Sequence, residues 1–184
     1  MLAAVAALAA AAAPGAVADG LARAVVTHVF DGDTLEVRLE GGPRRVRLIG
    51  VDTPETRDND KLARDVRRTG RSREALLALG RTAAAFTRDV ALGREVRLEH
   101  DVERRDRYGR LLAYVWLPDG RLLNAELLRA GHAVLMTIPP NVRHVDLFRR
   151  LQSEARAAGR GFWRAPAPPR SSAPRARRGR DAAA

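Results

Sequence analysis

The sequence predicts a mainly β (α+β) fold in which three strands come before any helix. Residues 24–30 form an apolar, β-branched run, residues 34–40 alternate apolar and polar side chains, and residues 44–51 return after a Gly-Gly-Pro turn. Alternation with a period of two is typical of a half-buried strand, and turn residues between two such runs indicate a hairpin. The first three strands are therefore expected to form a meander.

Two more strands and three helices are predicted after this meander. The strands are residues 95–100 and 108–117, and the helices are residues 74–92, residues 122–130 and a segment that follows residues 139–141. Apolar side chains three and four residues apart mark the core-facing stripe of an amphipathic helix. In the first helix this stripe consists of Leu76, Leu79, Ala83, Phe86 and Val90, and in the third it consists of Phe148, Leu151, Ala155 and Ala158.

Two local features of this part of the chain leave alternatives open. Gly80 marks either a kink or the true start of the first helix. Residues 56–73 are dense in charge and lack an apolar period, so we predict a surface loop there. Such a loop either follows a nucleic-acid backbone or is an ordinary solvated loop. Its six arginines are Arg57, Arg64, Arg67, Arg68, Arg71 and Arg73.

The two ends of the chain differ from the middle. Residues 1–18 are almost wholly Ala, Leu and Val and end in an A-x-A pattern, which predicts a cleaved signal peptide and export to the periplasm or the exterior. The amino end lacks the usual Lys or Arg, so an alanine-rich leader is the alternative. Residues 165–184 are rich in Pro and Arg, which indicates a disordered basic tail. Residues 19–164 are the predicted domain, with no stable membrane span, and we expect a monomer.

Composition limits the possible functions. The formal net charge is +11 and the sequence pI is about 11.5, which favours a polyanionic partner. The chain has no cysteine, so disulfides and thiolate metal sites are excluded. The four histidines lie in four different predicted elements without paired spacing, so zinc held by histidine is poorly supported.

The candidate site lies at the ends of the second and third strands. Asp33 and Asp52 can supply carboxylates to a hard cation, and the main-chain carbonyl of Thr53 stands beside them. Glu55 is left over for a general-base role, and Arg47 has the planar fork that suits phosphate oxygens. Each segment also has an ordinary explanation as a turn, because Asp-Gly and Asp-Thr-Pro are common turn sequences.

Three motifs resemble the staphylococcal nuclease family. Asp-Gly-Asp-Thr at residues 31–34, the stretch 47–55, and Asp-x-Tyr-Gly-Arg at residues 106–110 stand in the family's order and approximate spacing. The resemblance covers residues 24–163. It implies a five-stranded OB-type β-barrel with three α-helices, and a Ca²⁺-dependent phosphodiesterase that acts on DNA and RNA and leaves 3′-phosphate ends.

The resemblance also implies roles for individual residues. Asp33, Asp52 and the Thr53 carbonyl resemble the metal ligands, Glu55 resembles the general base, and Arg47 and Arg110 resemble the phosphate-binding arginines. Tyr108 is expected to lie near the bound nucleotide. One departure is Met136 and Ile138, which stand where the family's best-known member has tyrosines beside the nucleotide pocket, so base preference cannot be transferred.

These observations predict an exported nuclease that hydrolyses phosphodiester bonds of DNA and RNA. A non-catalytic OB-fold module that binds nucleic acid is the alternative, since such barrels bind strands without cutting them. A structural envelope protein with an inherited barrel is a third possibility. Cleavage that stops when calcium is chelated separates the first from the other two.

Overall fold

The computed structural model describes residues 21–164. The predicted signal peptide (1–18) and basic tail (165–184) lie outside the described residues, so both stay predictions. Within residues 21–164 no helix combines the length and the apolar character needed to cross a membrane.

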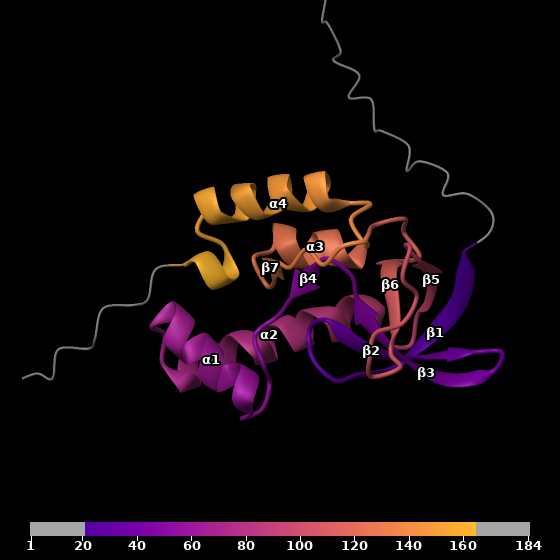
Figure 1. The fold of residues 1–184 in the computed structure, drawn as a ribbon, viewed down its shortest axis with the longest axis horizontal. Coiled ribbons are helices and arrows are strands. Elements are labelled where there is room, and N and C mark those ends of the chain that lie inside the picture. Colours follow the sequence, from indigo (N-terminus) through magenta and orange to yellow (C-terminus); the bar gives the residue numbers. More distant parts are fainter. Residues whose placement is uncertain (1–20, 165–184) are drawn as a thin grey trace, which may run out of the picture.

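Five strands close into a barrel in the order β1-β2-β3-β6-β5, which confirms the predicted architecture (Figure 1). Neighbouring strands pair antiparallel except β3 and β6, which run parallel and close the barrel. The strands are β1 (Ala22–Val29), β2 (Thr34–Leu39), β3 (Gly42–Leu48), β5 (Glu95–Glu99) and β6 (Leu111–Trp116). A separate two-stranded sheet, which the sequence did not predict, pairs β4 (Val51–Asp52) with β7 (Val134–Leu135).

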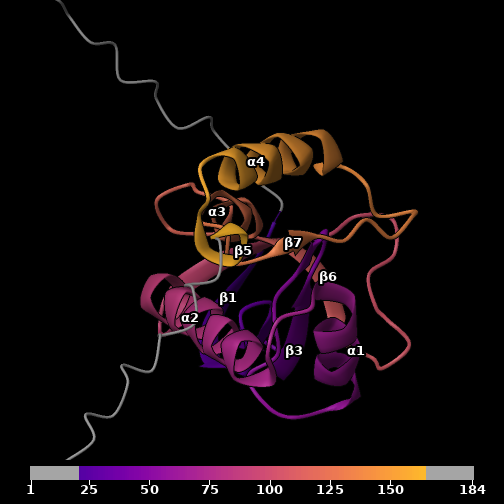
Figure 2. The same cartoon turned by 90° about the vertical axis from the view of Figure 1, so that its left-hand side faces the viewer.

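The described residues contain four α-helices, one more than predicted, and of these α2 and α3 pack against strands of the barrel. They are α1 (Asp60–Thr69), α2 (Arg73–Ala91), α3 (Leu123–Arg129) and α4 (Val145–Ala157), followed by the 3₁₀ helix η1 (Gly161–Trp163). Helices α3 and α4 stack on each other, and α1 packs against α2 on another side of the molecule (Figure 2).

The prediction of a loop over residues 56–73 is wrong, because α1 occupies its centre. Asn59 caps the helix by accepting a hydrogen bond of 2.9 Å from the N–H of Leu62, and Gly70 ends it with a φ of 66°. Asp65 pairs with Lys61 at i−4 and with Arg68 at i+3. Such pairs stabilise a helix whose apolar stripe is short.

The fifth strand of the barrel, β6, begins later than predicted. Residues 106–110 form a turn, in which Oδ1 of Asp106 accepts hydrogen bonds of 2.9 Å and 3.0 Å from the N–H groups of Tyr108 and Arg110. Gly109 has a φ of 79°, which only glycine adopts easily, so the strand starts at Leu111.

The core fills the barrel and continues under α3 and α4. Asn124 has a structural role: it is fully buried, accepts a hydrogen bond from the N–H of Val115 at 3.0 Å and donates to the Ile49 carbonyl at 2.8 Å. Its amide therefore ties α3 to β6 and to the end of β3. The largest fully buried side chains are Tyr114, Phe148, Leu35, Leu48, Leu62, Leu76, Leu98, Leu117, Leu123, Leu127, Leu128 and Val26.

Candidate nuclease-type site

Helix α2 positions the loop that carries Asp33. The hydroxyl of Thr87 donates a hydrogen bond of 2.7 Å to the carbonyl of Gly32. A Cβ on Gly32 would lie 2.7 Å from the Thr53 methyl and 2.8 Å from the Ala83 Cβ, so only glycine allows this approach. Oδ1 of Asp31 accepts a hydrogen bond of 3.1 Å from the N–H of Asp33. The loop is thereby fixed with Asp33 buried.

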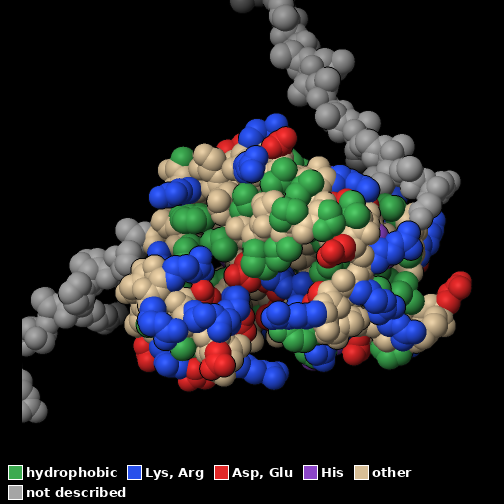
Figure 3. Space-filling model, viewed as in Figure 1, with side chains coloured by type: hydrophobic (Ala, Val, Ile, Leu, Met, Phe, Trp, Pro, Cys, Tyr) green, Lys and Arg blue, Asp and Glu red, His purple; other side chains and the backbone are tan. Residues whose placement is uncertain are grey.

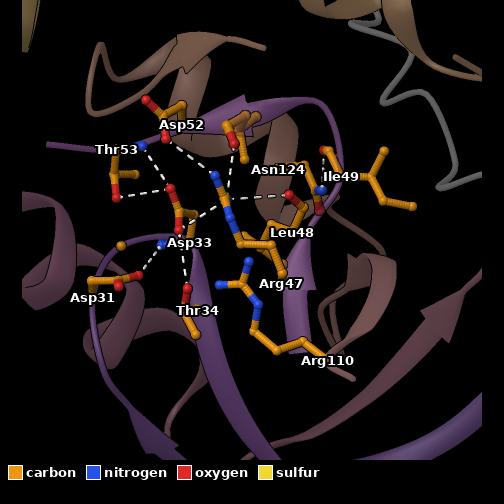
Figure 4. Close-up of polar contacts among 12 residues, drawn as sticks. Asp31, Asp33, Thr34, Arg47, Leu48, Ile49, Asp52, Thr53, Arg110 and Asn124 are labelled. Atoms are coloured by element: carbon orange, nitrogen blue, oxygen red, sulfur yellow. Dashed lines mark hydrogen bonds and ion pairs between the residues drawn. The ribbon is translucent and has the colours of Figure 1, made fainter. Parts of the chain in front are cut away.

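The end of β4 meets this loop directly. Oδ2 of Asp33 accepts hydrogen bonds from the N–H of Thr53 at 2.6 Å and from its hydroxyl at 3.1 Å. Residues 31–34 and 52–53, which the sequence separates by a hairpin, are therefore side by side (Figure 4). The prediction that both aspartates come to one place required this contact.

Arg47 joins the two aspartates. Its Nη1 lies 2.9 Å from Oδ1 of Asp33, and its Nη2 lies 3.1 Å from Oδ1 of Asp52. Nη1 also donates to the carbonyl of Val51 at 2.9 Å. Figure 4 shows the guanidinium of Arg47 beside the two carboxylates, with the side chain of Arg110 below that of Arg47. In this arrangement Arg47 faces the acids with its terminal nitrogens.

Glu55 lies beyond the aspartates, where α1 and α2 approach the same segment. Its Oε2 accepts a hydrogen bond of 2.7 Å from the side chain of Asn59, and its Oε1 lies 3.1 Å from Nζ of Lys61. Gly80 lies inside α2 without interrupting it, and a Cβ there would lie 2.1 Å from the Glu55 carbonyl oxygen. Gly80 therefore does not mark the start of the helix, and its missing side chain allows a close approach of α2 to the Glu55 segment.

Arg110 lines a cleft together with Arg47, which contacts the two aspartates. Its Nε donates a hydrogen bond of 2.6 Å to Oδ2 of Asp106, and its guanidinium carbon lies 5.5 Å from the centre of the Tyr108 ring. The cleft has a volume of about 750 Å³, large enough for a nucleotide. Its lining residues include Arg47, Arg110, Tyr108, Met136, Ile138, Leu48, Arg105 and Arg107. Tyr108 is 69% exposed, so its ring is accessible for stacking.

The surface around the site carries both signs of charge. Figure 3 shows lysine and arginine side chains gathered over the lower half of the face, on both sides of a hollow where acidic side chains are visible. A basic rim attracts a polyanionic ligand, and the acidic groups inside it can bind a cation.

Burial and neighbouring charges alter the protonation of the site. Burial and the nearby charge of Asp33 raise the pKa of Asp31 to about 7. Burial also raises the pKa of Asp52, against the opposing effect of Lys61. Burial alone would lower the pKa of Lys61, but the facing carboxylates of Asp52, Glu55 and Asp65 outweigh it and raise that pKa. The protonation of each acid at the site therefore depends on the charges of its neighbours.

Oxygens of the acid cluster already surround one positive charge. Nζ of Lys61 lies 3.3 Å from Oδ2 of Asp52, 3.0 Å from the Thr53 carbonyl oxygen and 3.1 Å from Oε1 of Glu55. The first two are predicted calcium ligands, whereas the third predicted ligand, Asp33, contacts Arg47 instead. Across residues 21–164, no three or more His, Cys, Asp or Glu side chains are arranged to hold a metal. The predicted set has two carboxylates and one main-chain carbonyl, so it does not depend on such a group.

Some residues at the site were not predicted from the sequence. Lys61, Asp65 and Asn59 all contact the acids or their partners, but they belong to the segment that was predicted as a loop. Asp31 was interpreted only as a turn residue. The signals for α1 were present in the sequence, namely Asn before a charged run and Gly after it.

Comparison with known proteins gives one family. A family model described as staphylococcal nuclease homologue matches residues 45–165. A protein named thermonuclease from Staphylococcus intermedius is 37% identical over 139 residues, which cover 76% of this chain and 74% of that protein. The thermonuclease of Staphylococcus hyicus is 33% identical over 138 residues, covering 75% and 73%. Endonuclease YncB of Bacillus subtilis (strain 168) is 32% identical over 145 residues, covering 78% and 62%.

Proposed function

The chain belongs to the staphylococcal nuclease family and is a phosphodiesterase, and from this premise we propose that it is an exported, Ca²⁺-dependent nuclease that cuts DNA and RNA. The observation that carries the proposal is the meeting of Asp33, Asp52 and Thr53 beside a cleft lined by Arg47 and Arg110. Export is supported by the leader-like residues 1–18.

Each side chain has a proposed role. Asp33, Asp52 and the Thr53 carbonyl would hold Ca²⁺, since carboxylate and carbonyl oxygens are its preferred ligands. When bound, the ion supplies positive charge that neutralises the phosphoryl group. Glu55 takes a proton from the attacking water, because its carboxylate lies at the edge of the same acid cluster.

The arginines are assigned to the substrate. Arg110 binds the phosphate and stabilises the negative charge that develops on it, with its Nε held by Asp106. Arg47 lines the same cleft and is the second proposed phosphate ligand, although it faces the aspartates in this structure. Tyr108 offers an exposed ring to the nucleotide. Cleavage on the 5′-oxygen side would leave 3′-phosphate ends.

One experiment tests the proposal. Purified protein is incubated with plasmid DNA and with RNA in calcium, magnesium, manganese or EGTA. We expect cleavage of both polymers in calcium and none in EGTA. Products with 3′-phosphate ends should block polymerase extension until a phosphatase removes the phosphate. Cleavage that persists in EGTA would contradict the calcium requirement, and binding without cleavage would contradict the catalytic assignments.

A further inference from the structure

Lys61 occupies a cation position inside the acid cluster. Its Nζ lies 3.0 Å from the Thr53 carbonyl oxygen and within 3.3 Å of carboxylate oxygens of Asp52, Glu55 and Asp65. It is the only lysine of the chain. One ammonium group thus meets four oxygens, which is more than its three protons can satisfy with linear hydrogen bonds.

Two of these oxygens belong to the calcium site of the proposed function. The Thr53 carbonyl and the Asp52 carboxylate are proposed metal ligands, and Glu55 is the proposed base. A divalent cation and an ammonium group cannot share such close oxygens, because like charges at this separation repel strongly. Only one of the two can be present at a time.

The spacing of the oxygens fits the ammonium group. The contacts to Nζ measure 3.0–3.3 Å. Calcium–oxygen distances are about 2.3–2.6 Å, so the Thr53 carbonyl and the Asp52 carboxylate would lie closer to a bound calcium ion than they lie to Nζ. The observed spacing is therefore that of ammonium contacts.

From this overlap, and resting on the metal site of the proposed function, we propose that Lys61 is an internal counter-ion that closes the acid cluster without metal and must be displaced by the divalent cation. Metal binding then becomes an exchange of one cation for another. The exchange weakens metal affinity and stabilises the metal-free protein.

Asp65 gives the displaced side chain a place to go. It lies one helical turn after Lys61 on α1, its carboxylate is 3.3 Å from Nζ, and it lies outside the proposed ligand set. The Lys61 side chain is 27% exposed, so it can swing away from Asp52 while keeping its partner on the same helix. Displacement therefore needs no change in the barrel.

Calorimetric titration of the full-length protein with CaCl₂, without nucleic acid, tests the exchange. Lys61→Met keeps the apolar stem and removes the charge, and Lys61→Gln keeps a hydrogen-bond donor. We expect both variants to bind calcium about tenfold more tightly than the wild type, as removal of a competing charge at contact distance predicts. Arg67→Met is the matched control, since it removes one exposed charge from the same helix and should leave the affinity within about twofold.

Thermal unfolding supplies a second readout that does not depend on activity. The Lys61 variants should melt at a lower temperature than the wild type in EGTA, and calcium should raise their Tm more than it raises that of the wild type. A Lys61 variant that is unfolded in EGTA and folds on addition of calcium would also support the exchange.

Wild-type or weaker calcium affinity in both Lys61 variants would overturn the exchange, and so would a lack of calcium binding in every protein. Plasmid cleavage by the wild type is measured separately. Tighter binding by the variants without any cleavage would leave the exchange standing and contradict the nuclease assignment. Cleavage by the wild type, together with unchanged calcium affinity in the Lys61 variants, would support the nuclease assignment and overturn the exchange.

Discussion

Arg47 and Asp33 form a buried ion pair in which Nη1 lies 2.9 Å from Oδ1, with side chains 11% and 7% exposed. The other terminal nitrogen of Arg47 contacts Asp52. One guanidinium therefore holds together two carboxylates from different strand ends, and the acid side of the site depends on it.

Loss of Arg47 should destabilise the fold. Arg47→Met leaves Asp33 and Asp52 without their shared counter-ion, and breaking a buried pair in this way typically costs about 3–5 kcal/mol. Urea denaturation in EGTA measures the loss. Arg38→Met, at an exposed position of β2, is the control and should change the free energy of unfolding by less than about 0.5 kcal/mol. Equal stability of the two variants would contradict the shared-counter-ion role.

Removal of the proposed base should affect turnover and not binding. Glu55→Gln keeps the size of the side chain and its contact distance to Asn59, but it cannot accept a proton from water. We expect kcat to fall about 10²- to 10⁴-fold, the usual contribution of general-base catalysis, with DNA affinity retained. Asp60→Asn removes an exposed carboxylate from the first turn of α1 and should keep wild-type kcat. Full activity of Glu55→Gln would remove Glu55 from the mechanism.

The two arginines of the 106–110 turn should differ in their importance. Both arginines line the cleft, but Arg110 has its Nε fixed on Asp106, whereas Arg107 is exposed and contacts the Tyr108 hydroxyl. Arg110→Ala should lower kcat about 10²- to 10³-fold, as loss of a donor to developing negative charge does. Arg107→Ala should lower kcat less than about tenfold. Similar losses of kcat in both variants would mean that Arg110 only attracts phosphate non-specifically and does not stabilise the transition state.

Protonation of His132 should weaken the fold at mildly acidic pH. Burial lowers the pKa of this ring, which packs 5.0 Å from the Phe86 ring, so the folded state prefers it neutral. Its contribution is complete above the unfolded-state pKa of about 6.5 and is lost as pH falls below that value toward the lower folded-state pKa.

His132→Phe checks this expectation. The free energy of unfolding, measured from pH 8 to pH 5, should fall more steeply for the wild type than for His132→Phe below pH ~6.5. His28→Phe, at an exposed position of β1, should keep the wild-type profile. Identical profiles for the wild type and His132→Phe would show that this ring does not contribute.

The barrel strands and the three motifs were predictable from the sequence because each rests on short-range patterns. An apolar, β-branched run identified β1, alternation identified β2, the Gly-Gly-Pro turn marked the return in β3, and the stripe from Leu76 to Val90 identified α2. Helix α1 was missed because its charges obscure a short apolar stripe, although Asn59 and Gly70 mark its ends. Its stability comes from pairs such as Lys61 with Asp65 and from packing on α2, and the second of these requires the folded chain.

The arrangement of the site was likewise predictable only in part. That Asp33 and Asp52 come together followed from strand ends that meet, but the guanidinium between them did not, because residue type alone does not say which way Arg47 turns. The position of Lys61 depends on a helix that was not predicted. Contacts between elements far apart in the sequence were the part that only the structure could supply.

The parallel seam between β3 and β6 joins an early strand to a late one, with Arg47 opposite Leu112. A chain that ends before Arg110 carries Asp33, Asp52 and Glu55 but lacks both Arg110 and β6, the strand that closes the barrel. Because pairings between strands far apart in the sequence form slowly, we expect nuclease activity only after β6 has joined the barrel.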